Sequence, residues 1–445
     1  MDSNIFNWIL ISIAILILII IGYKILNYRD YYSSIEKINY ELFKKFTILD
    51  ILSYISREYP DKPALKIKNK NWKTVSYSSY HDNVVKFAES INSWLGDEIR
   101  VAIMGVNGPG WVYSHLGCML NNGISIGIYS NIDSKMCEYI INDSKAEMLV
   151  IDGDEQLEKI SNINLENVKL IVYYSPIKKT EIVEKLSEKI KIPILSMGNF
   201  MTKQNKIEKK PELNHVCMLS YTAGTTENPK GTIITHKNII ASIMNVINLI
   251  NDNSKFKNFT EEQYISHLPL NNITTLIMDI YFPICTIGTV WFANKNNLNK
   301  TIIDVKPTIF IGTPQTWKNI CNEMKKNSSM LLDQMTKIIY PKLILEKTGF
   351  DKCKLAINFD DFISEYNINY LNNIGLKIYN IYGMSETTGI TSISLPTMNK
   401  YGSVGIPVMS VKINDDGEIL VKGNNLFSGY TNKISSTNIK KSWFH

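Results

Sequence analysis

Short apolar runs separated by helix-length stretches constrain the fold of this 445-residue chain more than any other feature. The runs are R-V-A-I-M at residues 100–104, E-M-L-V-I at 147–151, K-L-I-V-Y at 169–173 and T-I-F-I at 308–311. Runs of this length are typical of buried parallel strands, and the stretches between them are long enough to form covering helices. We therefore predict an α/β fold with parallel-rich sheets.

The charge balance argues against a nucleic-acid partner. The chain has 48 Lys and Arg residues against 42 Asp and Glu residues, a net charge of +6 spread over its whole length. A nucleic-acid surface needs a concentrated basic patch.

The six cysteines are scattered singly, without a C-x-x-C pair, and are expected to be free thiols in a reducing compartment.

The N-terminus contains an apolar segment with the length of a membrane span. Residues 5–26 reach the roughly 20 residues that cross the hydrocarbon layer. A cleaved signal peptide is the alternative, but Asp2 precedes the segment and a basic stretch follows it. Because Arg29 and Lys37 come after the span and Lys24 lies at its end, we expect a single-pass anchor with the bulk of the protein in the cytosol. This topology suits the endoplasmic reticulum and also any other membrane reached from it. Residues 27–46 would be a connector.

A loop rich in glycine and threonine carries the strongest chemical signal. Residues 219–231 read L-S-Y-T-A-G-T-T-E-N-P-K-G. Small residues let backbone N–H groups approach an anion, hydroxyls donate to phosphate oxygens, and Lys230 adds a positive charge. The loop does not match G-x-x-x-x-G-K-[ST], and the alternative interpretation is a surface turn. The residues predicted to bind phosphate are Thr222, Gly224, Thr225, Thr226 and Lys230.

This loop resembles the Y-T-S-G-T-T-G-x-P-K-G signature of the adenylate-forming superfamily, which includes acyl-CoA synthetases and luciferases. Y-G-M-S-E-T-T-G at 382–389 is similar to its Y-G-x-[ST]-E segment, and I-S-H-L-P-L at 265–270 resembles S-Y-L-P-L of long-chain members. Further matches in the same order extend the resemblance over residues 47–445. G-I-Y-S-N at 127–131 is most similar to long-chain and bubblegum-type fatty acyl-CoA synthetases.

The resemblance implies a fold and a two-step reaction. Two α/β lobes would occupy residues 47–390, and a small β-rich subdomain with a hairpin near 411–421 would occupy 391–445. A fatty acid carboxylate would attack the α-phosphate of ATP, giving acyl-AMP and pyrophosphate. The thiol of coenzyme A would then displace AMP.

The resemblance also assigns roles at the site. Thr222, Thr225, Thr226 and Lys230 would hold the β- and γ-phosphates, beside Gly224. Glu386, with Thr222, would hold Mg²⁺, for which oxygen ligands are suited. Tyr382 would stack on adenine, followed by Gly383, and Ser385 would reach the α-phosphate. Lys230 and Glu386 are the residues expected to be catalytic.

Several positions depart from the family pattern. Ala223 stands in place of Ser and Glu227 in place of Gly within the loop. Asn271 and Asn272 replace Ser-His, and Gln315 stands where long-chain members carry Arg. The most serious departure is Phe-Asp-Asp-Phe at 359–362, in place of G-A-A-P, because its rings and carboxylates would clash with adenine and repel phosphate unless the loop is rebuilt.

The sequence ends in S-W-F-H, which resembles the start of the family's W-[FL]-H-T-G-D segment. We expect truncation before the Asp of that segment and before the small C-terminal domain with its Lys.

Two hypotheses on function follow. One is a membrane-anchored fatty acid–CoA ligase with impaired chemistry. The other is a catalytically inactive pseudoenzyme that binds fatty acid, nucleotide or a protein partner. A weaker third is adenylation without thioester formation, which the anchor and the long-chain motifs argue against.

Overall fold

The structure is a computed structural model, and it describes residues 40–221, 228–251, 260–329, 340–394, 400–431, 439–440 and 443–444. The chain divides into two units, residues 1–44 and 45–445. In the first unit the structure describes the short helix α2 (Tyr40–Phe43). The predicted anchor at 5–26 lies outside the described residues. Among the residues that are described, no helix is long and apolar enough to cross a membrane.

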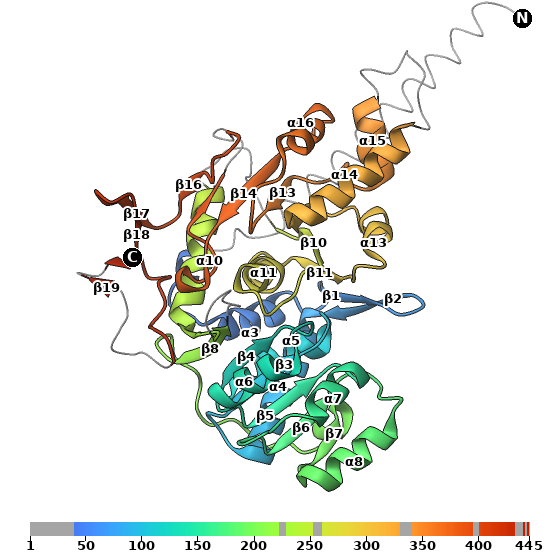
Figure 1. Cartoon of the computed structure of the whole chain (residues 1–445), viewed down its shortest axis with the longest axis vertical. Coiled ribbons are helices and arrows are strands. Elements are labelled where there is room, and N and C mark those ends of the chain that lie inside the picture. The colour runs from blue at the N-terminus through green and yellow to red at the C-terminus, as the bar shows by residue number, and fades with distance from the viewer. Residues whose placement is uncertain are drawn as a thin grey trace, which may run out of the picture. The chain divides into compact units, whose positions relative to one another are not determined.

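The second unit contains a seven-stranded sheet with the order β7-β6-β5-β3-β4-β8-β9 (Figure 1). Neighbouring strands are parallel except β9, which runs antiparallel to β8. The strands are β3 (Arg100–Met104), β4 (Ile124–Ile128), β5 (Met148–Ile151), β6 (Leu170–Tyr173), β7 (Ile194–Ser196), β8 (Val216–Tyr221) and β9 (Gly231–Thr235). The accompanying helices are α4 (Tyr77–Leu95), α5 (Pro109–Leu120), α6 (Ser134–Asp143), α7 (Asp154–Ser161), α8 (Thr180–Ile190) and α9 (Met197–Phe200).

A nine-stranded sheet has the order β16-β15-β14-β13-β12-β10-β11-β1-β2. The six strands from β14 to β1 are parallel, and β2, β15 and β16 are antiparallel. The strands are β1 (Pro63–Lys68), β2 (Trp72–Ser76), β10 (Gln263–Ser266), β11 (Thr289–Phe292), β12 (Ile309–Gly312), β13 (Leu355–Asn358), β14 (Ile378–Tyr382), β15 (Ser392–Ile393) and β16 (Ile406–Pro407).

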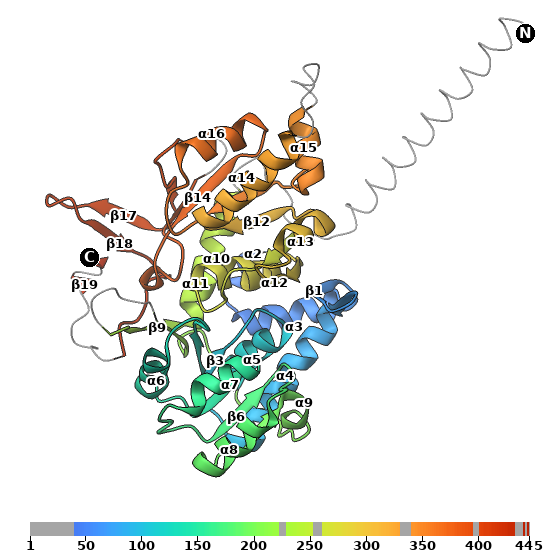
Figure 2. The same ribbon diagram turned by 45° about the vertical axis from the view of Figure 1, so that its right-hand side comes forward.

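The helices associated with this sheet are α3 (Ile48–Glu58), α10 (His236–Asn251), α11 (Ile273–Leu276), the π-helix η2 (Ile277–Tyr281), α12 (Phe282–Cys285), α13 (Leu298–Val305), α14 (Pro314–Ser329), α15 (Tyr340–Thr348) and α16 (Glu365–Asn373). Figure 2 shows α14, α15 and α16 together beside β12 and β14.

A small antiparallel sheet follows near the C-terminus, with the order β17-β18-β20-β19. Its strands are β17 (Ser410–Ile413), β18 (Ile419–Lys422), β19 (Ile439–Lys440) and β20 (Trp443–Phe444). The predicted hairpin near 411–421 is confirmed as β17 and β18. The predicted runs at 100–104, 147–151, 169–173 and 308–311 are confirmed as β3, β5, β6 and β12, within one residue at each end.

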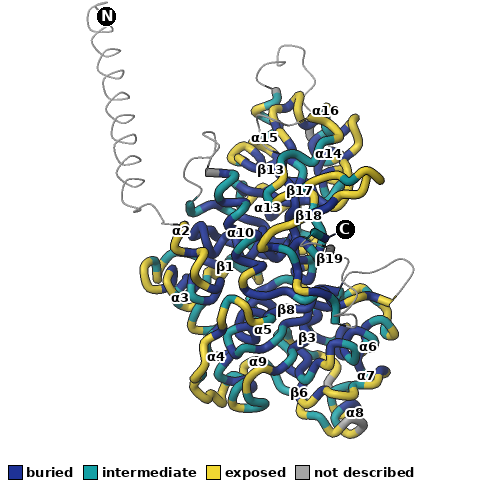
Figure 3. The backbone as a smooth tube through the Cα atoms, turned by 90° about the vertical axis from the view of Figure 1, so that its left-hand side faces the viewer, coloured by how far each residue is buried: buried dark blue, intermediate teal, exposed yellow. Residues whose placement is uncertain are grey.

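Each large sheet has its own apolar core. In the seven-stranded sheet, the strands pack against the apolar faces of α6 and α7, which contribute Ile140 and Leu157. In the nine-stranded sheet, Phe310 of β12 packs edge-on against Trp317 of α14. The indole N–H of Trp317 donates to the carbonyl of Ile357, 3.0 Å away, which ties α14 to β13. Figure 3 shows that the central strands, such as β3 and β8, are buried and that helices such as α8 and α16 contain exposed residues.

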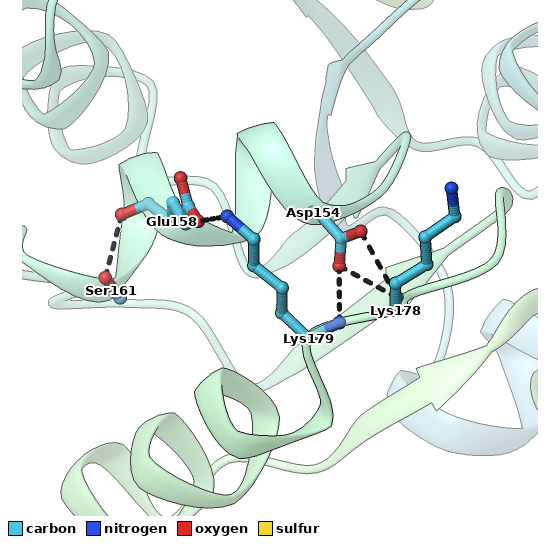
Figure 4. Close-up of polar contacts among 5 residues, drawn as sticks. All are labelled: Asp154, Glu158, Ser161, Lys178 and Lys179. Atoms are coloured by element: carbon cyan, nitrogen blue, oxygen red, sulfur yellow. Dashed lines mark hydrogen bonds and ion pairs between the residues drawn. The ribbon is translucent and has the colours of Figure 1, made fainter.

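One polar cluster connects α7 with the segment that leads into α8 (Figure 4). The Asp154 carboxylate accepts backbone N–H bonds from Lys178, at 3.0 and 3.2 Å, and from Lys179, at 3.0 Å. The ammonium of Lys179 pairs with Glu158, and the hydroxyl of Ser161 donates to the Glu158 carbonyl at 2.8 Å. Asp154 therefore serves as an acceptor for a turn that lies 24 residues further along the chain.

Candidate functional site

The predicted site residues that the structure describes lie at strand ends. Tyr382 is the last residue of β14, and it is followed by Gly383 and a short 3₁₀ helix, η3 (Ser385–Thr387), which contains Ser385 and Glu386. Lys230 is exposed and directly precedes β9. Thr222, Gly224, Thr225 and Thr226 lie outside the described residues, as do Ala223 and Glu227.

A direct contact joins the strand that enters the loop to the second motif. Ser220 is the residue before the end of β8, and its hydroxyl oxygen lies 3.2 Å from that of Ser385. Both side chains are buried. The structure therefore brings the 382–389 segment next to the strand from which the predicted phosphate loop departs.

The turn that carries Glu386 is fixed by its own backbone and by neighbouring side chains. The Gly389 N–H donates to the Met384 carbonyl at 2.9 Å, and Thr388 adopts a left-handed conformation with φ of 50°. A Cβ on Gly383 would lie 2.1 Å from the Gly389 carbonyl oxygen. Glycine is thus required at position 383 by the close approach of the backbone, a constraint that comes from the turn itself.

A second layer of hydrogen bonds anchors this turn from outside. The Ser242 hydroxyl of α10 donates to the Thr388 carbonyl at 2.9 Å. The Thr388 hydroxyl donates to the Asn425 carbonyl at 2.7 Å, and the amide of Asn425 donates to the Thr387 carbonyl at 3.0 Å. The two residues that follow Glu386 are therefore held by side chains and backbone groups that are distant in sequence.

Tyr430 is a site residue to which the sequence analysis assigned no role. Its hydroxyl donates to Oε1 of Glu386 at 2.6 Å. The Phe427 N–H also donates to the carbonyl of Glu386, at 2.8 Å. Tyr430 follows a glycine within the part of the chain over which the resemblance extends, and this was the available signal. A sequence motif does not indicate which carboxylate a tyrosine contacts.

Residues 427–431, which we name the strap, also pair with the beginning of β9. The Ile233 N–H donates to the Gly429 carbonyl at 2.9 Å, and the Ser428 N–H donates to the Ile233 carbonyl at 3.0 Å. The Thr431 N–H donates to the Gly231 carbonyl at 2.9 Å. Since Lys230 immediately precedes Gly231, the strap connects the Lys230 end of β9 with Glu386.

The Phe-Asp-Asp-Phe segment follows β13 at the same edge of the sheet, next to β14. Phe359 is buried, at 8% exposed, whereas Phe362 is 48% exposed. Asp360 has a left-handed φ of 86° and is exposed. Asp361 accepts the Phe362 N–H at 2.7 Å, and its carbonyl accepts the amide of Asn358 at 2.7 Å. The two rings therefore have different environments, and one of the two carboxylates is engaged by its own turn.

The asparagines that replace Ser-His have structural roles. Asn272 caps α11, because its Oδ1 accepts the N–H groups of Thr274 and Thr275 at 2.9 and 3.3 Å. Asn271 is buried against β4, since a Cβ on Gly127 would lie 2.6 Å from the Asn271 Cβ. The close approach of Asn271 to Gly127 places the end of β4 next to the segment that follows β10.

The other conspicuous substitution, Gln315, lies near the start of α14. Its amide donates to the Asn319 side chain, one helical turn further on, at 2.9 Å, and both residues are exposed. The position at which long-chain members carry Arg is therefore occupied by a side chain that interacts along its own helix.

The buried histidines are held in their neutral form. Burial lowers the pKa of His115 to about 3, and the pKa values of His236 and His267 to about 4. His115 hydrogen-bonds Ser125 at 2.7 Å and Tyr281 at 2.5 Å, and His267 stacks on Phe310. At neutral pH these imidazoles carry no charge, so they contribute neither attraction nor repulsion for a phosphate.

The donor set suits a metal ion that arrives with a nucleotide. Within the described part of the chain, no group of three or more His, Cys, Asp or Glu residues is placed to hold a metal ion. Glu386 supplies one carboxylate, half-buried and fixed by Tyr430. Mg²⁺ is commonly bound by one or two carboxylates together with substrate phosphates, so a single oriented carboxylate fits this ion.

The two parallel-rich sheets, with the motif residues at their strand ends, define the α/β fold of adenylate-forming enzymes. Among solved structures, the chain resembles the adenylation domain of a carboxylate reductase from Mycobacterium chelonae (TM-score 0.75, 14% identity, 90% of this chain and 69% of that one). It also resembles O-succinylbenzoate coenzyme A synthetase from Bacillus subtilis in complex with AMP (TM-score 0.66, 18% identity, 88% and 93%).

A family profile described as AMP-binding enzyme matches residues 53–431, and the chain belongs to this family. It is 28% identical over 430 residues to human long-chain-fatty-acid–CoA ligase ACSBG2, covering 84% of this chain and 62% of that protein. It is also 28% identical over 440 residues to rat long-chain-fatty-acid–CoA ligase ACSBG1, covering 87% and 60%. The chain thus spans about three fifths of the length of these curated relatives.

Proposed function

We propose that this chain carries the carboxylate-activating site of a fatty acid–CoA ligase, which uses ATP to form an acyl-adenylate and then a thioester with coenzyme A. The observation that carries the proposal is the contact between Ser220 and Ser385, which sets the Glu386 turn beside the strand entering the phosphate loop. The similarity to long-chain-fatty-acid–CoA ligases supports a fatty acid as the substrate.

In the first step, a carboxylate oxygen of the fatty acid forms a bond to the α-phosphorus of ATP. The bond from that phosphorus to the bridging oxygen breaks, and pyrophosphate leaves with the electron pair. The Lys230 ammonium would stabilise charge on the phosphates, and Thr222, Gly224, Thr225 and Thr226 would donate to them. Mg²⁺, held by Glu386 with Thr222, would supply further charge neutralisation when bound with the nucleotide.

The remaining residues would orient the nucleotide. Tyr382, 37% exposed at the end of β14, offers a ring face to a planar base. Ser385 already shares a hydrogen bond with Ser220, which would fix its hydroxyl while it reaches the α-phosphate. Gly383 lies against the Gly389 carbonyl, and this close backbone approach would fix the position of Tyr382 relative to Ser385.

We propose the following organisation for the chain. Residues 5–26 form a transmembrane anchor and residues 27–46 a connector, with a cytosolic α/β region at 47–390 and a β-rich subdomain at 391–445. The apolar character of the first segment supports the anchor. An anchor would keep the site near a membrane, such as that of the endoplasmic reticulum, in which fatty acids dissolve.

A pseudoenzyme is the second candidate, and the Phe-Asp-Asp-Phe segment favours it. The exposed Asp360 and the half-exposed Phe362 stand at the end of β13, next to the end of β14 where Tyr382 lies. Two added carboxylates at this edge would repel the phosphates of ATP. Without bound ATP the acid would not be activated, and its coupling to coenzyme A would be lost.

Calorimetric titration of Mg·ATP into the full chain in detergent micelles tests the proposal. We expect micromolar binding that both Lys230→Ala and Glu386→Ala weaken, followed by release of pyrophosphate when a fatty acid is added. Absence of binding at millimolar ATP would refute the ligase and leave the pseudoenzyme. Pyrophosphate release without a thioester product on addition of coenzyme A would limit the activity to adenylation.

A further inference from the structure

We propose that Tyr430 is a positioning residue that holds the Glu386 carboxylate in the orientation needed for nucleotide-bound magnesium. This inference rests on the proposed function. The observation behind it is the hydrogen bond from the Tyr430 hydroxyl to Oε1 of Glu386, at 2.6 Å. Within the described part of the chain, Oε2 of the same carboxylate makes no hydrogen bond. One oxygen is therefore held by Tyr430, and the other could bind a metal ion.

The backbone of the strap explains why this tyrosine can act as a fixed support. Tyr430 forms an antiparallel bridge with Thr232, and the residues on either side of it are bonded to β9. Two residues before Gly429, the Phe427 N–H is bonded to the Glu386 carbonyl at 2.8 Å. Both the carbonyl and the carboxylate of Glu386 are therefore contacted by the same five-residue segment.

The phenyl ring and the hydroxyl of Tyr430 have separable roles. The ring packs edge-on against Phe427, with centroids 4.9 Å apart, at the margin of the small core that includes Val421 and Phe444. Phenylalanine at position 430 would keep this packing and remove the hydroxyl alone. The hydroxyl is the donor in the bond to the Glu386 carboxylate, so its removal takes away this bond.

A fixed carboxylate matters because a free one must be oriented when the metal arrives. Hydrogen-bond partners behind metal-binding side chains typically contribute factors of about 10 to 100 to metal affinity. The tyrosine sits on the segment that also pairs with the Lys230 end of β9, so it would orient Glu386 relative to the strand that leads from the phosphate loop.

The test compares the full-length wild type with Tyr430→Phe and Thr431→Val. Thr431→Val is the matched control, because it removes a hydroxyl from the neighbouring strap residue, whose partner is Asp143 at 3.5 Å, without touching Glu386. ATP affinity is measured by calorimetry over a series of Mg²⁺ concentrations and in EDTA.

Magnesium should tighten ATP binding, and the Mg²⁺ concentration that gives half of this effect is the quantity compared. For Tyr430→Phe we expect this concentration to rise about 10-fold. The ATP affinity measured in EDTA should be unchanged. Thr431→Val should match the wild type in both conditions. A wild-type magnesium dependence in Tyr430→Phe, or an equal loss of affinity with and without magnesium, would overturn the inference while leaving the proposed function intact. A wild type that fails to bind Mg·ATP at all would overturn both.

A second measurement needs neither metal nor nucleotide. Thermal unfolding of Tyr430→Phe, Glu386→Ala and the double variant forms a double-mutant cycle. We expect the double variant to melt close to the Tyr430→Phe variant, because either change already breaks the bond. Additive shifts in melting temperature would show that the two side chains are uncoupled and would contradict the positioning role.

Discussion

Ser220 and Ser385 are 165 positions apart in the sequence, and their hydroxyl oxygens lie 3.2 Å apart in the buried interior. One belongs to the seven-stranded sheet and the other to the turn that follows β14 of the nine-stranded sheet. This contact fixes the distance between the strand that enters the predicted phosphate loop and the turn that carries Glu386.

Removing the Ser220 hydroxyl should therefore destabilise the fold measurably. We expect Ser220→Ala to lower the free energy of unfolding by about 1–2 kcal/mol, because the buried Ser385 hydroxyl loses its partner. Urea denaturation measures this loss. Adding Ser385→Ala should cost little more, since both ends of the bond are then absent. A fully additive double variant would contradict the coupling.

Lys230→Ala should weaken nucleotide binding without unfolding the protein. Charge-assisted hydrogen bonds to phosphate contribute about 1.5–3 kcal/mol, which corresponds to a loss of about 10- to 100-fold in ATP affinity. Calorimetry provides the affinity and thermal melting the stability. Lys237→Ala, at an exposed lysine on α10 beyond the opposite end of β9, is the control and should bind like the wild type. Equal losses in the two variants would indicate a general charge effect.

Asp360→Gly should stabilise the protein. Asp360 has a φ of 86°, a conformation that costs a side-chain-bearing residue about 1 kcal/mol or more and costs glycine little. Asp361→Gly has the opposite expectation, because it removes the carboxylate that accepts the Phe362 N–H. Urea denaturation of both variants distinguishes the two effects. A loss of stability in Asp360→Gly would mean that its carboxylate has a stabilising partner.

Stability should fall as the solution is acidified below about pH 6.5. The pKa values of His115, His236 and His267 are lowered in the folded state to between about 3 and 4, so the unfolded chain binds more protons at pH 5. The buried Asp279 acts in the opposite direction, since burial raises its pKa and so favours its protonated form in the folded state.

Because several histidines take up protons on unfolding and Asp279 alone opposes them, unfolding is accompanied by net proton uptake. Each net proton corresponds to a loss of about 1.4 kcal/mol per pH unit between about pH 6 and 5. Urea midpoints at the two pH values measure the slope, and His115→Gln should reduce it. A flat profile over this range would contradict the neutral, buried state of these histidines.

Asp154→Ala should destabilise the periphery of the seven-stranded sheet. Its carboxylate accepts backbone N–H bonds from Lys178 and Lys179, and such charge-assisted bonds typically contribute about 1.5–3 kcal/mol (Figure 4). Lys179→Met removes only the exposed ion pair with Glu158 and should leave the stability unchanged. Chemical denaturation checks both. An equal effect of the two variants would show that the ion pair and not the backbone bonds holds this turn.

Local sequence patterns were sufficient to predict the α/β layers and the strands at 100–104 and 308–311, because runs of apolar residues are typical of buried strands. They also indicated which segments contain the candidate site residues. The hydrogen bond between Tyr430 and Glu386 could not be predicted in this way, since it depends on how the strap pairs with β9.

The same holds for the Phe-Asp-Asp-Phe segment. Its composition suggested two rings against the nucleotide, whereas Phe359 is in the interior and Phe362 is half exposed. Which ring turns inward depends on the left-handed Asp360, and a conformation of that kind is not encoded by residue type alone. The roles of Thr222, Thr225 and Thr226 stay predictions.

The pairing of the strap with β9 has a further consequence for solubility. β9 is the last strand of the seven-stranded sheet, and residues 428–431 satisfy backbone groups on its outer side. An uncovered edge strand presents a row of unpaired N–H and C=O groups to which another chain can add. A version of this protein cut before residue 428 would expose that edge, and self-association through β9 would then compete with folding.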